Sequence, residues 1–394
     1  MTSKCVVAGV GMIQFTKPGQ SRSYSEMGEE AARLAIKDAG IEYTDIGQVF
    51  AGYVYADSTA GQAAVYGIGL SGVPVFNVNN ACASGSTALF LARQAVESGV
   101  CDCALALGFE QMNPGALGSV YTDRKMPAYR FVDRMDAIQG LDPNAPGTAQ
   151  FYGGAAKQYG DKYGADPTSF AKIATKARRH AANNPLALFK EALTVEDVLN
   201  SKQIFQSVTR LQCCPPTCGA AAAIICTEKF AKENGLSSGV KIVAQEMVTD
   251  LDGTFDEGSM LQLIGYDITK EASSRLYEAA SVGPEDIDVV EMHDCFTVNE
   301  FVMYEALGLT PEGTANQFVQ DDENTYGGKI VTNPSGGLLS KGHPLGATGL
   351  AQCAELVWQL RGDASKRQVP EAKFGLQHNL GLGGACVATL YSNA

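Results

Sequence analysis

Histidine and tryptophan are scarce in this chain, which has four histidines and one tryptophan among its 394 residues. It also lacks an apolar stretch long enough to cross a bilayer, because Gly, Cys and charged residues interrupt each run rich in Ala and Val. Acidic residues outnumber basic ones, and the formal net charge of −13 excludes a broad cationic surface. We therefore expect no nucleic-acid partner and no membrane insertion.

Targeting signals are a second absence. The N-terminal residues lead directly into a strand-like segment instead of the apolar core of a signal peptide, so the eleven cysteines are expected to be reduced thiols. The last residues, Ser392, Asn393 and Ala394, do not form a peroxisomal address of the Ser-Lys-Leu type. The expected location is the cytoplasm, or a peroxisome or mitochondrion if the source is eukaryotic.

Strands and helices alternate through most of the chain, which favours sheets covered by helices. Residues 4–10 form a strand-like run, Ser23 and Glu26 form a capping box that opens a helix to about Asp38, and another strand is expected near residues 48–53. One α/β unit returns at a constant offset, which matches Ala31 with Ala272, Ala39 with Ala280, Asp45-Ile46 with Asp286-Ile287, and Val49 with Val290. The sequence therefore predicts two similar halves.

Both halves also contain a turn of small residues, a helix that ends at glycine, and then an apolar strand. These are residues 81–86, a helix to about Ser98 and a strand over residues 100–107 in the first half, and residues 342–349, a helix to Arg361 and a strand over residues 374–378 in the second.

Residues 116–212 interrupt this pattern, because they are richer in charge, Tyr and Pro and lack regular alternation. We predict an N-terminal half over residues 1–115 plus 213–238, an inserted loop domain over residues 116–212, and a C-terminal half over residues 239–394.

Cys82 lies between a predicted strand over residues 73–78 and the helix that follows it. At a helix N-terminus the unpaired amides and the dipole are expected to lower the thiol pKa and to make the thiolate available as a nucleophile. Taken alone, such a cysteine is more often a small core residue, so this interpretation depends on partners elsewhere.

Two histidine segments supply candidate partners. His343 lies in Gly342-His343-Pro344 at the entrance of a helix, where rigid neighbours suit an accessible general base. His293-Asp294-Cys295-Phe296 follows an apolar strand, with His293 and Cys295 expected on the same side of the chain. Zinc binding is the competing interpretation. Zinc sites need three or four ligands at defined spacings, and the chain offers no Cys-x-x-Cys pair elsewhere, so we predict no metal.

A fourth segment, from Gln377 to Gly384, ends in a glycine-rich turn. Asn379, Gly381 and Gly383 are its candidates for stabilising an oxyanion, since backbone amides in such a turn approach a ligand closely. A tight turn without function is the alternative.

Together these four segments resemble the thiolase superfamily along nearly the whole chain. Cys82 matches the family's acyl-accepting cysteine, and Gly342-His343-Pro344 matches its Gly-His-Pro motif. Most thiolases have Asn-Glu-Ala-Phe in place of His293-Asp294-Cys295-Phe296 and Cys-x-Gly in place of Asn379-Leu380-Gly381. Both departures resemble the sterol carrier protein 2 thiolases, the thiolase domain of sterol carrier protein x.

The resemblance implies an α/β thiolase fold, with two βαβαβ-type halves in a layered α-β-α-β-α core and an inserted loop domain. It implies at least a homodimer, or a tetramer. A fused lipid-transfer domain is not expected, because the chain ends soon after its last predicted strand.

The function implied is that of a 3-oxoacyl-CoA thiolase, an acetyl- or propanoyl-CoA C-acyltransferase of fatty acid β-oxidation, which also runs backward as a Claisen condensation. In a two-cysteine ping-pong cycle Cys82 would carry the acyl group, His343 would be its base, His293 would stabilise the enolate and Cys295 would be the second acid and base. Acyl-CoA would be the substrate and coenzyme A the co-substrate, with no tightly bound cofactor.

Coenzyme A needs local cations in an acidic chain, and the best basic segment contains Lys176, Arg178 and Arg179. An exposed helix face explains the same spacing.

Two alternatives stay open. One is a thiolase-like aldolase or acyltransferase that acts on steroid side chains, and the other is a non-catalytic thiolase-like protein that binds acyl-CoA or lipid. The joint presence of Cys82 and Cys295 favours thiolysis, because an enzyme without acyl transfer needs no acyl-accepting thiol. These motifs leave chain length, 2-methyl branching and a sterol moiety of the substrate undefined.

Overall fold

A computed structural model describes residues 5–115, 117–236, 239–256 and 258–393 of the chain. The first residue of the strand expected at residues 4–10, the lead-in before it and the final residue of the C-terminal triplet lie outside these ranges. Within them, every helix is too short or too polar to cross a membrane.

Ten strands in the described ranges form two five-stranded sheets with the same topology. The first sheet, in the order β3-β2-β4-β7-β1, contains β1 (Cys5–Met12), β2 (Gln48–Gly52), β3 (Val75–Val78), β4 (Cys103–Glu110) and β7 (Gly219–Thr227). The second, in the order β10-β9-β11-β12-β8, contains β8 (Lys241–Val248), β9 (Val289–Glu291), β10 (Val331–Thr332), β11 (Phe374–Gly381) and β12 (Ala385–Ser392). Val6 of β1 pairs with Lys241 of β8 and joins the two sheets at one edge.

Strand directions repeat as well. β2 runs parallel to β3 and β4, as β9 runs parallel to β10 and β11, while β7 and β12 run antiparallel to their neighbours. A single 3-10 turn precedes β2 at Tyr43–Asp45 and precedes β9 at Pro284–Asp286. The two similar halves predicted from the repeat are therefore confirmed.

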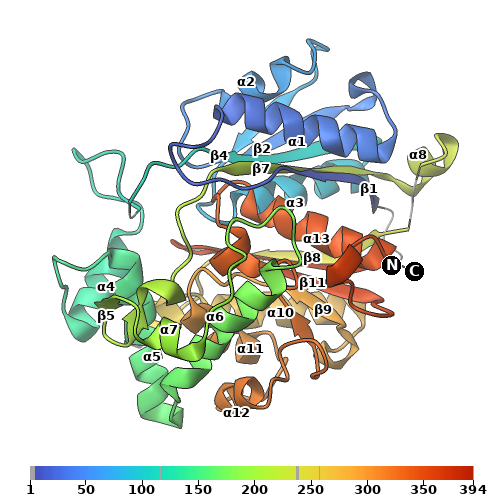
Figure 1. Cartoon of the computed structure of the whole chain (residues 1–394). Helices are drawn as coiled ribbons and strands as arrows, with labels where there is room; N and C mark the ends of the chain where they lie inside the picture. Colours follow the sequence, from blue (N-terminus) through green and yellow to red (C-terminus); the bar gives the residue numbers. More distant parts are fainter. Residues whose placement is uncertain (1–4, 116, 237–238, 257, 394) are drawn as a thin grey trace.

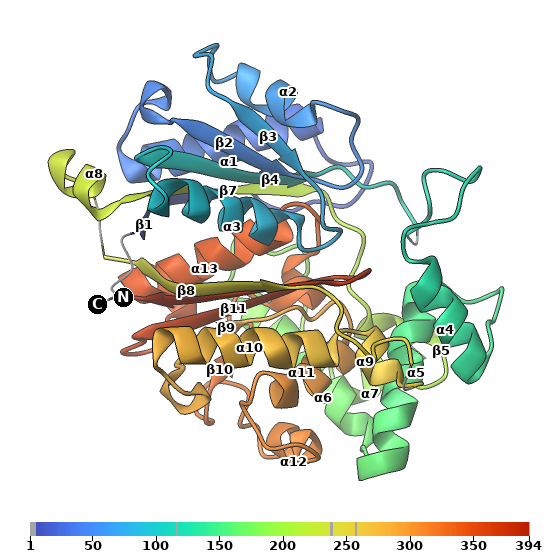
Figure 2. The same cartoon turned by 180° about the vertical axis from the view of Figure 1, so that it is seen from behind.

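Helices complete five layers, which Figures 1 and 2 show from opposite sides. The outer helices of the first sheet are α1 (Tyr24–Ala39) and α2 (Ala60–Tyr66), the helices between the sheets are α3 (Ser84–Glu97) and α13 (Thr348–Arg361), and the outer helices of the second sheet are α10 (Tyr266–Ala280) and α11 (Thr297–Ala306). This is the α-β-α-β-α core implied by the resemblance.

The two central helices approach each other closely at their N-terminal ends. A Cβ atom added to Gly85 in α3 would lie 2.5 Å from the carbonyl oxygen of Gly346, just before α13, so only glycine fits there. α13 is buried on nearly all sides, as a helix between two sheets must be. The loop before α3 and the loop before α13 are thereby held face to face.

Local boundaries follow the expected signals with two differences. The capping box of α1 is present as predicted, with Ser23 and Glu26 bonding each other's backbone amides. β4 begins at Cys103 instead of residue 100, because Gly99 at φ +75° turns the chain and leaves Val100 exposed. β11 continues to Gly381, so Asn379 and Gly381 lie in a strand and not in the glycine-rich turn.

The span 116–212 lies beside the core and is mostly helical (Figure 1). It contains α4 (Tyr129–Gln139), α5 (Gly147–Tyr163), α6 (Pro167–Ala181), α7 (Val195–Leu199) and a hairpin of β5 (Gln203–Phe205) and β6 (Val208–Thr209). The 3-10 turn Arg210–Gln212 ends this span. Short elements outside it are α8 (Glu228–Glu233), α9 (Met260–Leu263), α12 (Ala315–Gln320), the 3-10 turn Ser365–Arg367 and the π-helical turn η4 (Gly337–Lys341). The domain boundaries themselves stay a prediction.

Candidate active site

Three of the predicted catalytic residues meet between the two halves. Cys82 Sγ, one ring nitrogen of His293 and one ring nitrogen of His343 all lie within 4.8 Å of one another. Cys82 comes from the loop before α3, His343 from the loop before α13, and His293 from the loop after β9. Residues more than two hundred positions apart therefore form one site.

Cys82 is held in a tight loop directly before α3. Ala81 takes a left-handed conformation at φ +48°, and Ser84 Oγ donates a 2.7 Å hydrogen bond back to the Ala81 carbonyl. Burial raises the pKa of Cys82 to about 12, although a backbone hydrogen bond from Leu382 acts in the opposite direction. The predicted lowering of this pKa by the helix N-terminus is therefore wrong, since desolvation outweighs the dipole.

A neutral thiol needs a base, and His343 is arranged as one. Its Nδ1 lies 2.7 Å from Thr348 Oγ1, and that hydroxyl donates to the carbonyl of Pro344 at 2.9 Å. Because the hydroxyl proton is committed to Pro344, Nδ1 must carry the shared proton and Nε2 keeps a lone pair. Among the described residues Nε2 is buried without a hydrogen-bond partner, and burial lowers the pKa of His343 to about 3. His343 is thus a neutral proton acceptor.

The hydrogen bonds of His293 favour the tautomer opposite to that of His343. The side-chain amide of Asn379 donates to its Nδ1 at 3.0 Å, which leaves the proton on Nε2. Burial, then the electrostatic repulsion that protonation would create with His343 and His378, lowers the pKa of His293 well below its ordinary value. Its ring lies nearly perpendicular to that of His343, with centroids 5.1 Å apart.

Cys295 lies in the same cavity and has a partner that the sequence did not reveal. Its Sγ is 3.1 Å from the hydroxyl of Tyr152, which comes from α5 and stacks on Phe296 at 4.4 Å between ring centroids. Burial raises the pKa of Cys295 well above its ordinary value. A tyrosine in a segment without a recognisable motif gave no sequence signal for this contact.

A cavity of about 670 Å³ joins these groups. Its reactive end contains Cys82, His293, Cys295 and His343, and the rest of its wall is mostly apolar, with Met112, Leu117, Ala149, Ile204, Phe296 and Leu345 among its lining residues. It is therefore suited to a substrate with a hydrophobic tail and a polar reacting group.

Comparison with known proteins places this geometry in a family. The model of the thiolase N-terminal domain matches residues 5–229, and a thiolase C-terminal domain-like model matches residues 257–391. The chain belongs to the thiolase family. Human sterol carrier protein 2 is 53% identical to this thiolase over 389 residues, which cover 98% of this chain and 71% of that protein. The Caenorhabditis elegans non-specific lipid-transfer protein-like 2 is 44% identical, and 98% of this chain covers 96% of it.

Solved structures agree with the fold. The Ltp2-ChsH2(DUF35) aldolase matches with a TM-score of 0.83 at 23% identity, covering 99% of this thiolase and 97% of that chain. The human mitochondrial 3-ketoacyl-CoA thiolase matches with a TM-score of 0.74 at 18% identity, with coverage of 99% and 98%. The predicted fold and the predicted relation to sterol carrier protein 2 are both confirmed.

Two buried carboxylates hold the catalytic loops of this thiolase together. Glu291, at the end of β9, accepts hydrogen bonds from the backbone and hydroxyl of Ser335 and forms an ion pair with Lys341 at 3.1 Å. Asp294 accepts from the backbone amide of Leu338 at 2.6 Å. The loop that carries His293 and Cys295 is thereby fixed to the turn that leads into His343.

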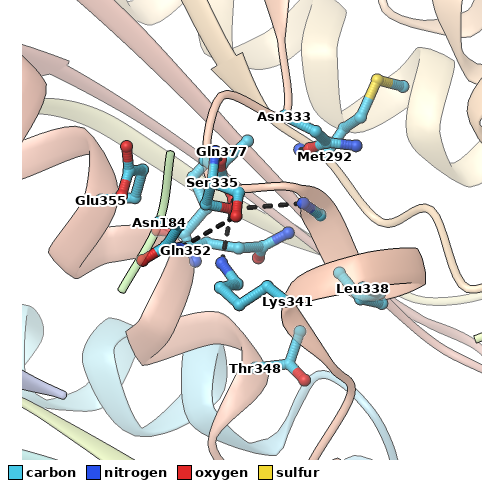
Figure 3. Close-up of polar contacts among 12 residues, drawn as sticks. Asn184, Met292, Asn333, Ser335, Leu338, Lys341, Thr348, Gln352, Glu355 and Gln377 are labelled. Carbon is cyan, nitrogen blue, oxygen red and sulfur yellow. Dashed lines mark hydrogen bonds and ion pairs between the residues drawn. The ribbon is translucent and has the colours of Figure 1, made fainter. Parts of the chain in front are cut away.

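Figure 3 shows this polar cluster, with Lys341 and Ser335 at its centre. Asn184 adds a third contact, because its side-chain amide donates to the Ser335 carbonyl at 2.9 Å. Ser335 and Lys341 are both almost completely buried. Buried charges persist only when they are paired, so the cluster favours one arrangement of the loops.

The structure contradicts the role proposed for Lys176 in coenzyme A binding, while the roles proposed for Arg178 and Arg179 stay predictions. Lys176 is almost fully buried, and its ammonium group is ion-paired with Glu300 and bonded to Thr332, so it has no surface for a phosphate. Arg178 packs on the Phe189 ring, and Arg179 donates to Thr325 Oγ1 at 3.2 Å. The lining of the cavity includes a different cation, Arg210, whose side chain is exposed.

The glycine-rich turn contributes less directly than predicted. The backbone contact with Cys82 comes from Leu382, between the predicted Gly381 and Gly383. Gly383 takes φ +107°, and it borders a small neighbouring pocket with Gly381 and Leu382. Leu382 lines both this pocket and the catalytic cavity, so the turn still borders the site.

The two other histidines are structural. His378 lies behind His293, where its Nδ1 is 3.5 Å from the His293 backbone nitrogen and its Nε2 is 3.0 Å from Thr269 Oγ1. His180 is bonded at both ring nitrogens, to the Asn333 carbonyl and to Thr325.

Among the residues that the structure describes, Cys82, His293 and His343 are the group able to hold a metal ion. Coordination by His293 would require its Nε2 proton to move to Nδ1, against the Asn379 amide. We assign no metal to the site.

Proposed function

We propose that this thiolase cleaves 3-oxoacyl-CoA with coenzyme A through an acyl-Cys82 intermediate. The observation that carries the proposal is the opposite hydrogen-bonding character of the two histidines beside Cys82. His343 offers an acceptor for the thiol proton, His293 offers a donor for a developing oxyanion, and Cys295 supplies a second thiol in the same cavity.

The first half-reaction begins when His343 Nε2 takes the proton of Cys82 Sγ. The thiolate attacks the 3-oxo carbon, and the bond between C2 and C3 breaks with its electron pair passing to the thioester as an enolate. His293 Nε2–H, with the protonated His343, donates to the enolate oxygen. Cys295 gives its proton to C2, which releases acetyl- or propanoyl-CoA and leaves a thiolate at Cys295.

The second half-reaction restores both cysteines. The Cys295 thiolate takes the thiol proton of an incoming coenzyme A, whose sulfur attacks the acyl-Cys82 carbonyl. Backbone amides beside Cys82 and in the turn at Leu382 and Gly383 are the proposed donors to the tetrahedral oxyanion. Cys82 leaves as a thiolate and recovers its proton from His343. The hydroxyl of Tyr152 can donate to Cys295 while that sulfur is a thiolate.

Coenzyme A is anionic, so its phosphates need a cation near the cavity mouth. We propose Arg210 for this contact, because it lines the cavity and its side chain is exposed. The human mitochondrial 3-ketoacyl-CoA thiolase, whose fold this chain shares, has been solved in complex with CoA. The apolar lining of the cavity favours an acyl group longer than acetyl. Assembly of the chain into at least a dimer stays a prediction.

Mass spectrometry of the intact protein tests the proposal directly. After incubation with a 3-oxoacyl-CoA in the absence of coenzyme A, the wild type is expected to gain one acyl group, which added coenzyme A then removes. Cys82→Ala should gain none, and Cys101→Ala, which alters a half-buried cysteine outside the site, should behave as the wild type does.

The same assay separates the alternatives. Cleavage of a 3-hydroxyacyl-CoA to a carbonyl compound and an acyl-CoA, without coenzyme A and without an acyl adduct, would support the aldolase interpretation. Binding of acyl-CoA without any cleavage would support a non-catalytic protein. Cys295→Ala is expected to lose turnover; if its turnover were normal, the second acid and base would have to be another group.

A further inference from the structure

A chain of buried hydrogen bonds runs from the C-terminal strand to His293. Tyr391 donates to Gln377 Oε1 at 2.5 Å, and Gln377 Nε2 is 2.9 Å from Ser86 Oγ. Ser86 Oγ is 2.8 Å from Asn379 Oδ1, and Asn379 Nδ2 is 3.0 Å from His293 Nδ1. Each of these side chains is at most 2% exposed. Solvent therefore has little access to the chain.

A backbone carbonyl, which can only accept hydrogen bonds, sets the direction of donation along this series of hydrogen bonds. Gln377 Nε2 also lies 2.7 Å from the backbone carbonyl of Gly349, so the NH2 end of the Gln377 amide must face both Gly349 and Ser86. Reversing the amide would place two oxygen atoms against each other. Gly349 has to be glycine, because a Cβ atom there would lie 2.1 Å from Ser86 Oγ.

The remaining links follow from that direction. Ser86 accepts from Gln377, and its single proton goes to Asn379 Oδ1. With the oxygen of Asn379 facing Ser86, its NH2 group must face His293 Nδ1. An NH2 group can only donate there, so Nδ1 is unprotonated and Nε2 carries the ring proton.

A shorter chain of hydrogen bonds, which also ends on a backbone carbonyl, holds His343 in the opposite tautomer. Thr348 donates to Pro344 and so accepts from Nδ1 of His343. Two neighbouring imidazoles, both neutral because they are buried, are thus held in opposite tautomers.

We infer that Gln377, Ser86 and Asn379 form a one-way hydrogen-bond relay that locks His293 in its Nε2–H form, as a donor and not a base. The inference rests on the proposed function for its catalytic consequence, since the Nε2 proton is the one offered to the enolate oxygen. The three residues are positioning residues, because they act only through His293. The relay joins the halves: Ser86 belongs to α3, and Gln377 and Asn379 belong to β11.

Asn379→Asp is the sharpest test, because it replaces the NH2 group by an oxygen of similar size. The new carboxylate can only accept, so it is expected to draw a proton onto Nδ1 of His293. Spectra of 15N-histidine-labelled protein are simple with four histidines, and His293→Gln identifies the His293 signals. The wild type is expected to show Nε2 protonated and Nδ1 bare, and Asn379→Asp to show Nδ1 protonated.

The matched control is Asn324→Asp. Asn324 is also buried and donates from its side-chain amide to the Tyr304 hydroxyl at 2.8 Å, but it is not in the relay. It is expected to leave the His293 signals unchanged, which separates the relay from a general effect of a buried carboxylate. A wild-type spectrum with Nδ1 protonated, or an unchanged His293 tautomer in Asn379→Asp, would overturn the relay.

Kinetics provide the second readout. In Asn379→Asp, kcat for thiolysis at pH 9 is expected to fall about 10²-fold with KM within about threefold, as for loss of one oxyanion donor. Ser86→Ala, which removes the middle link, should give a smaller loss and both tautomers of His293, while Ser273→Ala, a buried hydroxyl outside the relay, should change neither. If kcat were normal in both Asn379→Asp and Ser86→Ala, the tautomer of His293 would have no effect on catalysis.

The two claims can fail separately. If the wild type shows the Nε2–H tautomer but forms no acyl-Cys82, the relay stands and the proposed function fails. If acyl-Cys82 forms but the tautomer does not respond to Asn379→Asp, the relay fails and the proposed function stands.

Discussion

The two halves of this thiolase share a strand order but differ in the chemistry that they supply. In both, a loop leads into a central helix, and a residue with a proposed catalytic role lies in that loop: Cys82 before α3 and His343 before α13. The second half adds His293 and Cys295 in the loop after β9, whereas the corresponding loop after β2 contributes neither a histidine nor a cysteine. The repeated topology places the groups, and the loops decide what they do.

The two halves also differ in a buried side chain at one matched strand position. At the constant offset that matches Val49 with Val290, Phe50 in β2 corresponds to Glu291 in β9. Phe50 packs in an apolar cluster, while Glu291 forms the buried ion pair with Lys341 beside the catalytic loops. At this matched position the second half therefore has a buried ion pair, whereas the first half has an apolar contact.

Removing the base of the second half is expected to give the largest effect on activity. His343→Gln keeps a polar side chain but cannot take the Cys82 proton, so kcat for thiolysis should fall about 10³-fold. Steady-state assays with a 3-oxoacyl-CoA measure this. Activity within tenfold of the wild type would mean that His343 and Cys82 do not act as a pair across the two halves.

The contribution of Glu291 to stability tests the difference between the buried side chains of the two halves. Glu291→Gln leaves Lys341 buried without its counter-charge and is expected to lower the free energy of unfolding by about 3–5 kcal/mol. Denaturant unfolding measures the loss. Glu271→Gln, which removes the exposed pair with Arg275, should cost less than about 0.5 kcal/mol. Equal losses would mean that burial of the Glu291 pair has no special role.

Helix α6 can be compared with the cavity mouth through two arginines, Arg179 and Arg210. Arg210→Ala is expected to raise KM for coenzyme A about tenfold, the effect of one lost charge-assisted hydrogen bond, with kcat nearly unchanged. Arg179→Ala is expected to leave this KM within about twofold. The opposite pattern would move the phosphate contact back to α6.

The last comparison concerns the pH dependence of Cys82 in the first half. Burial raises the pKa of Cys82 to about 12, so its thiolate fraction in the free protein should grow about tenfold per pH unit between pH 7 and 9 without a plateau. Iodoacetamide alkylation of Cys82, followed by peptide mass spectrometry, measures this rise. A plateau below pH 8 would show a lowered pKa and would make the base in the second half unnecessary for activation.

Sequence reasoning succeeded where short-range signals repeat. The capping box of α1, the glycines that follow α3 and α13, and the offset between the halves are local patterns with direct structural causes, and each recurs in the structure. The sequence was a poorer guide where a side chain bonds to a residue far away in the chain. Lys176 was interpreted as a surface cation because its spacing fits a helix face, and only the packing of α6 against α11 turns it toward Glu300.

The pKa of Cys82 shows the same limit. A helix N-terminus is visible in the sequence, but the depth at which that terminus is buried is not, and desolvation determines the sign of the shift.

The sequence by itself determined the family, the two-fold repeat and the identities of Cys82, His293, Cys295 and His343, because each lies in a short motif. Tertiary structure decided how these residues are protonated and which neighbours hold them. Tyr152, Ser86, Gln377 and Thr348 lie outside the reacting groups, and their roles arise only when buried donors and acceptors are paired in space. A hydrogen-bond direction depends on every partner in the chain, and the sequence does not list those partners.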